Sequence, residues 1–209
     1  LITSETYSRW CHPMDKSVTT IFGDGAAAVY LCHAKGEHGI GPFIFGTDGR
    51  GFQNLIVPYS GSHRIHSNDA GDNETANESG NIRTSANLYM NGPELFRFAM
   101  GTVPSLVKDV LSASKTSFEN IDKFVFHQAN FYMLKNIQKM LRIPDSKMIY
   151  EIEDVGNTVS ASIPIALKRA YDKGSISVGE KLLLAGFGVG YSWAGTILTW
   201  NPDVLRHEI

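Results

Sequence analysis

The amino-acid sequence predicts a layered α/β fold. Between residues 124 and 200, segments with strand and helix patterns follow one another in the order β, α, β, α, β, β, which is typical of helices packed against a sheet. The 209 residues suffice to bury roughly 70% of the surface of the unfolded chain. Apolar residues make up 43% of the chain, and no apolar run approaches the ~20 residues of a membrane-spanning helix. We therefore expect a soluble globular protein.

The first third of the chain predicts two strands and a loop. Residues 19–33 are rich in β-branched and aromatic side chains but are interrupted by Gly23-Asp24-Gly25, which indicates a strand with a glycine bulge. Residues 40–47 have the composition of a second strand, and the segment from Gly36 to Gly39 would form the hairpin turn between them. Residues 60–81 are almost entirely polar, which predicts a long mobile surface loop.

Two helices follow, each recognised by apolar residues at helical spacing. The first covers residues 93–114, with Pro93 at a position suited to the first turn. A short buried strand, Phe124–Phe126, comes next. The second helix covers residues 133–141, and Asn130 can cap its start.

The same strand and helix pattern then repeats. Residues 148–152 predict a strand, and residues 160–171 predict a helix that ends at Gly174. Residues 182–184 and 192–200 predict two further strands on either side of a glycine-rich turn.

Composition excludes several classes of partner. Nineteen Lys and Arg against 21 Asp and Glu give a net charge of −2, so nothing global favours nucleic acid or an anionic membrane. The low charged fraction of 19% favours an oligomer interface. Cys11 and Cys32 cannot form a disulfide framework, so a reducing cytoplasm is expected. The chain starts at Leu1, without a methionine, in what resembles the inside of a strand, and we expect that further residues precede it.

Two polar side chains occupy positions where α/β sheets carry their sites. His127 directly follows the strand Phe124–Phe126, and Asn157 takes the equivalent place in the next unit, so both can face one crevice. An imidazole N–H and a carboxamide N–H that converge on one point form a donor pair for a developing oxyanion. Spacing alone favours the alternative, in which His127 satisfies local backbone and Asn157 is a turn residue.

Two further motifs suggest a dinucleotide site and a nucleophilic cysteine, but their residue patterns do not support either. Residues 186–190 lack a complete G-x-G-x-x-G and precede a strand, so a tight hairpin close to a ligand fits better than a dinucleotide site. Cys11-His12 and Cys32-His33 are neighbours whose side chains point to opposite faces of an extended strand, so we interpret both cysteines as structural.

The polar loop contains residues of the types that bind metals. A solvated loop is the favoured interpretation, because a metal site needs a fixed geometry, and no metal is predicted. The candidate ligands are His63, His66, Asp69, Asp72 and Glu74.

Taken together, five segments resemble the β-ketoacyl-acyl-carrier-protein synthase III family of thiolase-fold condensing enzymes. The most specific are His127-Gln128-Ala129-Asn130 and the Gly-Asn-Thr segment that runs from Gly156 to Leu167. The others are residues 21–28, 90–96 and 186–195. The resemblance implies a thiolase-like layered fold, with residues 1–80 ending the N-terminal half, including the polar loop, and residues 81–209 forming the C-terminal half.

The family implies a decarboxylating Claisen condensation between acyl-coenzyme A and malonyl-acyl carrier protein, which initiates fatty acid biosynthesis. His127 and Asn157 match the histidine and asparagine that bind the malonyl thioester oxygen. Such donors are worth ~3 to 4 kcal/mol each when water is excluded. This role requires a neutral His127, which the N-terminus of the following helix would favour. The thioesters are substrates, and no cofactor is implied.

The sequence departs from the family pattern in two places. The nucleophilic cysteine of the family lies well upstream of Gly23-Asp24-Gly25, and Cys11 is too close to that segment and has different surroundings. This chain alone is therefore not expected to form an acyl-enzyme, and by itself we expect it to be inactive in the condensation. Val189 stands where the family usually has glycine in the loop that donates a backbone N–H to the acyl oxyanion; either its backbone lies in an ordinary region or the loop has shifted.

The resemblance also assigns binding residues. Lys16 falls where the family places an arginine near the coenzyme A nucleotide. Arg97, Lys135 and Lys139 resemble the basic face that meets the acidic carrier protein, although without the fold a solvated helix face is the favoured interpretation. The pantetheine tunnel and acyl loop correspond to Met90, Gly92, Phe96, Ala129, Asn130, Gly188 and Val189.

Two alternatives remain open. One is a related thiolase-fold acyltransferase of the polyketide type, or a hydroxymethylglutaryl-coenzyme A synthase. The other is a noncatalytic module that pairs with another subunit. The family implies a homodimer, and apolar strand surface near Leu1 also predicts association.

Overall fold

A four-stranded mixed sheet forms the centre of the molecule. The computed structural model describes residues 1–33, 39–60 and 73–201. The sheet has the order β3 (Ile40–Thr47), β10 (Ser192–Thr199), β9 (Lys181–Gly188) and β8 (Lys123–Phe126). β8 runs parallel to β9, and the other two pairs are antiparallel.

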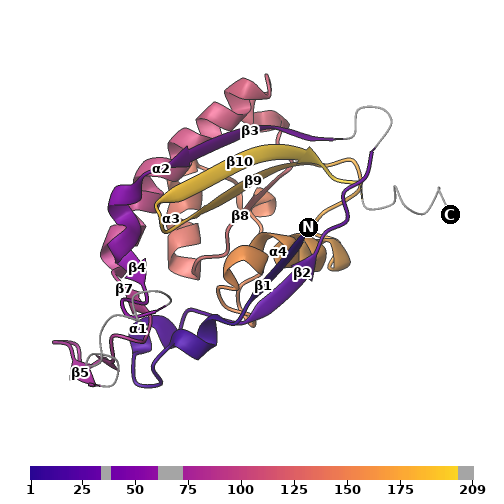
Figure 1. Ribbon diagram of the computed structural model, residues 1–209. Coiled ribbons are helices and arrows are strands. Elements are labelled where there is room, and N and C mark those ends of the chain that lie inside the picture. Colours follow the sequence, from indigo (N-terminus) through magenta and orange to yellow (C-terminus); the bar gives the residue numbers. More distant parts are fainter. Residues whose placement is uncertain (34–38, 61–72, 202–209) are drawn as a thin grey trace.

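Helices cover both faces of this sheet (Figure 1). α2 (Gly92–Ala113) and α3 (Phe131–Leu141) pack on one face, and α4 (Ser162–Asp172) packs on the other. β1 (Ile2–Glu5) and β2 (Gly25–Ala28) form a separate antiparallel pair beside α4. The remaining short elements are α1 (Lys16–Thr19), β4 (Leu55–Ile56), β5 (Thr75–Ala76), β6 (Ile82–Arg83), β7 (Tyr89–Met90) and the 3-10 turns Tyr7–Trp10, Gly49–Asn54, Phe118–Asn120, Asp145–Lys147 and Val159–Ala161.

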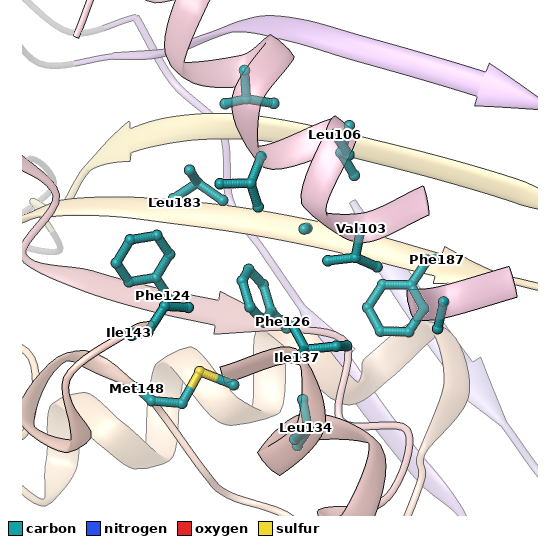
Figure 2. Packing of buried hydrophobic residues seen from close by; sticks show 14 of the residues in the cluster. Val103, Leu106, Phe124, Phe126, Leu134, Ile137, Ile143, Met148, Leu183 and Phe187 are labelled. Atoms are coloured by element: carbon teal, nitrogen blue, oxygen red, sulfur yellow. The ribbon is translucent and has the colours of Figure 1, made fainter. Parts of the chain in front are cut away.

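The core is built from alternate residues of the central strands. Phe124 and Phe126 of β8 face α2 and α3, whereas Val125 between them faces α4. All three are fully buried, so both faces of the sheet are covered here, which explains why Phe124–Phe126 is a continuous apolar run. Figure 2 shows Phe124 and Phe126 packed with Leu106 of α2 and Ile137 of α3.

The helix ends follow the predicted capping chemistry. The side-chain oxygen of Asn130 accepts a hydrogen bond from the backbone N–H of Met133 at 2.7 Å, which caps α3 as predicted. Asn91 caps α2 in the same way, and Pro93 lies in its first turn. Gly174, with φ +72°, lies just beyond the end of α4. Among the described helices, none is long and apolar enough to cross a membrane.

The predicted hairpin between residues 19–33 and 40–47 is wrong. Within residues 19–33, only residues 25–28 form a strand, and this strand, β2, pairs with β1. The first residue of the segment, Thr19, belongs to α1. β3 instead pairs with β10, about 150 residues further along the chain. Local composition shows that both segments are extended, but it does not reveal a partner so distant in sequence. Part of the proposed turn, residues 34–38, lies outside the described residues.

The strand predicted at residues 148–152 is also wrong. Met148 makes a single parallel bridge with Phe124, and the segment then leaves the sheet. The segment leaves the sheet because a side chain replaces the neighbouring strand as hydrogen-bond acceptor. The backbone N–H of Glu151 donates to Oε1 of Gln128 at 2.9 Å.

The predicted polar loop is partly ordered into a hairpin. β5 and β6 pair across a turn at Asn77–Gly80, whereas residues 61–72 lie outside the described residues. β3 belongs to the same sheet as β8, β9 and β10, so a strand from the first 80 residues completes the sheet of the later part of the chain. The division of the chain at residue 80 stays a prediction.

Candidate active site

A cavity of about 700 Å³ lies between the start of α2, the start of α3 and the end of β9. His127 and Asn157, the two residues predicted to converge, both line it. The cavity also brings together the residues expected at the pantetheine tunnel and the acyl loop: Met90, Gly92, Phe96, Ala129, Asn130, Gly188 and Val189. Apolar side chains such as Phe98, Met100 and Phe187 complete much of the wall, so the two polar groups act in a largely apolar setting.

His127 is held at the end of β8 by backbone and ring contacts. Its backbone N–H donates to the carbonyl of Ala185 at 2.8 Å, and its ring meets the ring of Phe187 edge to face, with centroids 5.6 Å apart. Nδ1 lies 2.6 Å from the hydroxyl oxygen of Ser162. Burial lowers the pKa of His127 to about 4, so the ring is neutral at pH 7. Desolvation is the cause of this shift.

Asn157 is positioned by the backbone of a distant segment. Its N–H donates to the carbonyl of Ile21 at 2.8 Å, and its carbonyl accepts from the N–H of Gly23 at 3.0 Å. The side-chain Oδ1 accepts from the backbone N–H of Val159 at 2.9 Å, which leaves the NH₂ group as the free end of the carboxamide. Asn157 therefore does not follow a strand, as the sequence predicted, but is held by a bridge to Phe22.

The cavity thus combines a neutral imidazole with a fixed carboxamide. A neutral imidazole donates one hydrogen bond without adding a charge, and a carboxamide can donate two. Donors held in a largely apolar cavity favour the build-up of negative charge on an oxygen bound between them. This arrangement suits a reaction that passes through an oxyanion or enolate.

The glycine-rich turn forms the predicted hairpin between β9 and β10. Val189 lies at this turn and lines the cavity. Among the described non-glycine residues, those with positive φ are Lys115, Arg142 and Val159, so the backbone of Val189 lies in an ordinary region. A valine at this turn therefore does not need the positive φ that its β-branched side chain disfavours.

The predicted charged residues are dispersed. Lys16 is exposed at the start of α1, where its backbone N–H donates to Asn81, and it does not line the cavity. Arg97 lies at the cavity and forms an ion pair with Glu94. Lys135 and Lys139 line a separate groove on α3.

Metal and cysteine chemistry find no support in the described part of the chain. No group of three potential metal ligands occurs there, and His63, His66, Asp69 and Asp72 lie outside the described residues. Cys11 and Cys32 are both free. Burial, with smaller contributions from Asp15 and Asp24, raises the pKa of the Cys11 thiol, which disfavours the thiolate.

Several site residues were missed by the sequence analysis. Ile21 and Phe22 line the cavity, and Ser162 contacts His127 from the start of α4. Each lies within a segment that carried the family resemblance, but the type of residue alone revealed no role. The available signal was the position of Ile21 and Phe22 in the segment 21–28, and of Ser162 in the Gly156–Leu167 segment.

Comparison with known proteins identifies the same family. The family model described as 3-oxoacyl-(acyl-carrier-protein) synthase III matches residues 1–49, and the model of its C-terminal part matches residues 111–200. A β-ketoacyl-acyl-carrier-protein synthase III from Porphyra umbilicalis is 36% identical over 205 residues, covering 96% of this chain and 59% of that protein. The chain therefore spans about three fifths of the length of this relative.

Solved structures agree in fold. A crystal structure of a 3-oxoacyl-(acyl-carrier-protein) synthase III, 46% identical, superposes with a TM-score of 0.89 over 96% of this chain and 59% of that one. The corresponding enzyme from Thermus thermophilus is 31% identical, with a TM-score of 0.79 over 96% of this chain and 58% of that one. The thiolase-like α/β fold implied by the resemblance is thus confirmed, and the chain belongs to the β-ketoacyl-acyl-carrier-protein synthase III family.

Proposed function

We propose that this chain supplies the enolate-stabilising part of a β-ketoacyl-acyl-carrier-protein synthase III. In this reaction an acyl group from acyl-coenzyme A is condensed with malonyl-acyl carrier protein, which initiates fatty acid biosynthesis in the cytoplasm. The observation that carries the proposal is that His127, neutral at pH 7, and Asn157 line one cavity.

The two side chains act on the malonyl thioester. When carbon dioxide leaves, the electrons of the broken carbon–carbon bond pass to the remaining thioester as an enolate. Hydrogen bonds from His127 and Asn157 to the enolate oxygen stabilise this charge most strongly at the transition state. The enolate carbon then attacks the acyl thioester on an enzyme cysteine, and that cysteine leaves as a thiolate.

The cavity wall suits the arm that carries the malonyl group. Pantetheine is long and largely uncharged, and Met90, Phe96 and Ala129 offer it apolar contact while Asn130 and the Gly188–Val189 turn offer polar groups. No metal or redox cofactor is needed, because coenzyme A and phosphopantetheine thioesters are the substrates.

Decarboxylation of malonyl-coenzyme A by the 209-residue chain tests this assignment directly. We expect His127→Ala and Asn157→Ala each to lower the rate of acetyl-coenzyme A formation by about 100-fold. His33→Ala and Asn120→Ala, at exposed positions, serve as matched controls. A rate that persists in both active-site variants would overturn the proposal, and an inactive unmodified chain would favour a noncatalytic pairing module.

The acyl-transfer half of the reaction is not assigned to this chain. Cys11 does not line the cavity and its thiol pKa is raised, so we expect no acyl-enzyme. Intact mass after incubation with acetyl-coenzyme A should therefore show no added acetyl group. A covalent acetyl on Cys11 would contradict this part of the proposal.

The carrier protein and a second copy of the chain are the proposed partners. Arg97, Lys135 and Lys139 are exposed and can attract an acidic carrier protein. We expect Arg97→Glu combined with Lys139→Glu to weaken carrier-protein binding at low salt. If the affinity for the carrier protein is unchanged, these side chains belong to a solvated helix face and do not bind the carrier protein.

A further inference from the structure

A hydroxyl group lies against His127 on the side of the ring held by α4. Ser162 is only 2% exposed, and its Oγ lies 2.6 Å from Nδ1 of His127. The proposed reaction uses His127 as a donor, and it assigns no role to this hydroxyl. The contact nevertheless decides which ring nitrogen carries the hydrogen of a neutral imidazole.

The direction of this hydrogen bond follows from the partners of Ser162. The backbone N–H of Gln128 also points at Ser162 Oγ, at 3.4 Å, so the oxygen already serves as an acceptor. Among the described residues, His127 Nδ1 is the one acceptor in reach of the hydroxyl hydrogen. If Nδ1 were protonated instead, the buried hydroxyl hydrogen would have no acceptor, at a cost of ~1 to 3 kcal/mol.

The backbone around this contact is held by a second buried side chain. The Nε2 of Gln128 donates to the carbonyl of Phe126 at 2.6 Å, and its Oε1 accepts from the N–H of Glu151 at 2.9 Å. Gln128 is 1% exposed, so these bonds fix the segment that follows His127. Nε2 of His127 makes no hydrogen bond to any residue that the structure describes, which leaves it for a ligand in the cavity.

We propose that Ser162 is a positioning residue, whose hydroxyl donates to Nδ1 of His127 and thereby places the imidazole hydrogen on Nε2. Its effect on turnover rests on the proposed function, in which Nε2–H donates to the enolate oxygen. The tautomer itself is a property of the chain and can be measured without any substrate.

Long-range proton–nitrogen correlation spectra of the uniformly ¹⁵N-labelled chain at pH 7 provide the test. The signals of His127 are assigned by their absence in His127→Gln. We expect the unmodified chain to show a protonated Nε2 and an unprotonated Nδ1. Ser162→Ala should populate the opposite tautomer or average the two, whereas Ser162→Thr, which keeps a hydroxyl, should retain the pattern of the unmodified chain.

Ser160→Ala is the matched control, because this hydroxyl lies in the same segment but donates to Glu5 at 2.6 Å. It should leave the His127 signals unchanged. An unmodified chain with hydrogen on Nδ1 would overturn the proposal even if Ser162→Ala fails to fold. A folded Ser162→Ala variant with unchanged His127 signals would also overturn it.

Decarboxylation kinetics then separate this inference from the proposed function. We expect Ser162→Ala to lower kcat for malonyl-coenzyme A at least tenfold with little change in KM, and Ser162→Thr to restore it. The expected tautomer with no turnover in any variant would support the positioning role and contradict the proposed function. Unchanged kcat in Ser162→Ala, with an active unmodified chain, would contradict the catalytic consequence of the positioning.

Discussion

Gly23 lies against the main-chain carbonyl of Val155 so closely that a Cβ at position 23 would overlap its oxygen. Gly156, with φ +66°, follows Val155 directly, and a Cβ at position 156 would lie 2.9 Å from the carbonyl oxygen of Ile21. Only glycine permits this contact between two backbones. The contact forms the bridge that holds Asn157 at the cavity, which explains physically why both segments contain glycine.

Replacement of Gly23 by alanine should therefore disturb both stability and the site. The obstacle is backbone rather than a flexible side chain, so the two segments must separate and the hydrogen bonds at Asn157 must weaken. We expect a loss of about 2 to 3 kcal/mol in the free energy of unfolding, measured by urea denaturation. Gly188→Ala is the control, because among the described residues, its chain neighbours aside, no heavy atom lies within 4 Å of its Cβ position. Equal stability of Gly23→Ala and Gly188→Ala would contradict the predicted overlap between a Cβ at position 23 and the carbonyl of Val155.

The buried imidazole predicts how stability depends on pH. The pKa of His127 is about 4 in the folded chain, below the ~6.5 of an exposed histidine. Between these values the unfolded chain binds more protons, so stability should fall as the pH is lowered from about 6.5 to about 4. The contribution amounts to roughly 3 kcal/mol at most.

Urea denaturation at a series of pH values measures this contribution. His127→Gln should flatten the profile between pH 6.5 and 4, whereas His33→Gln, at an exposed position, should retain it. If the two variants show the same pH dependence, the imidazole of His127 is not the group responsible.

A buried ion pair ties α1 to β6. Asp15 is fully buried, and its carboxylate accepts a hydrogen bond from Arg83 at 2.7 Å and another from the N–H of Ser17 at 3.0 Å. Removing one member of such a pair leaves the other without compensation. We expect Asp15→Asn to cost about 3 kcal/mol in thermal or urea denaturation.

An exposed ion pair gives the comparison. Lys168 and Asp172 are 71% and 53% exposed on α4, four residues apart. Asp172→Asn should change stability by less than about 0.5 kcal/mol, because solvent screens such pairs. A similar loss of stability in Asp15→Asn and Asp172→Asn would show that burial does not determine how much Asp15 contributes to stability.

Local patterns predicted the elements whose causes are local. The cap of α3 at Asn130 and the apolar strand at Phe124–Phe126 depend on neighbouring residues, and both were predicted correctly. The pairing of β3 with β10 and the loss of the strand at residues 148–152 depend on partners far away in sequence. No periodicity reports such contacts.

The same distinction holds for the site. The positions of His127 and Asn157 were predicted to face one crevice, and both line one cavity. The predicted reason was correct for His127, which follows β8, and wrong for Asn157. Asn157 is positioned by its bridge to Phe22 instead of by a preceding strand. Ser162 was missed because a serine at a helix start usually satisfies that helix, and its contact with His127 exists only in the folded chain.

Gly46 and Trp193 form a cross-strand pair in the central sheet. The two residues are opposite each other on β3 and β10, and a Cβ at position 46 would overlap the indole ring. Gly46→Ala should displace Trp193 from its contact with Phe98, where the ring centroids are 5.9 Å apart, at a cost of about 1 to 3 kcal/mol. Gly186→Ala on β9 is the control, because its nearest neighbour would be the Ile163 methyl at 3.7 Å. Tryptophan fluorescence and urea denaturation should both change in the first variant and stay near the parent in the second. Unchanged fluorescence in Gly46→Ala would show that the indole does not occupy the space above Gly46.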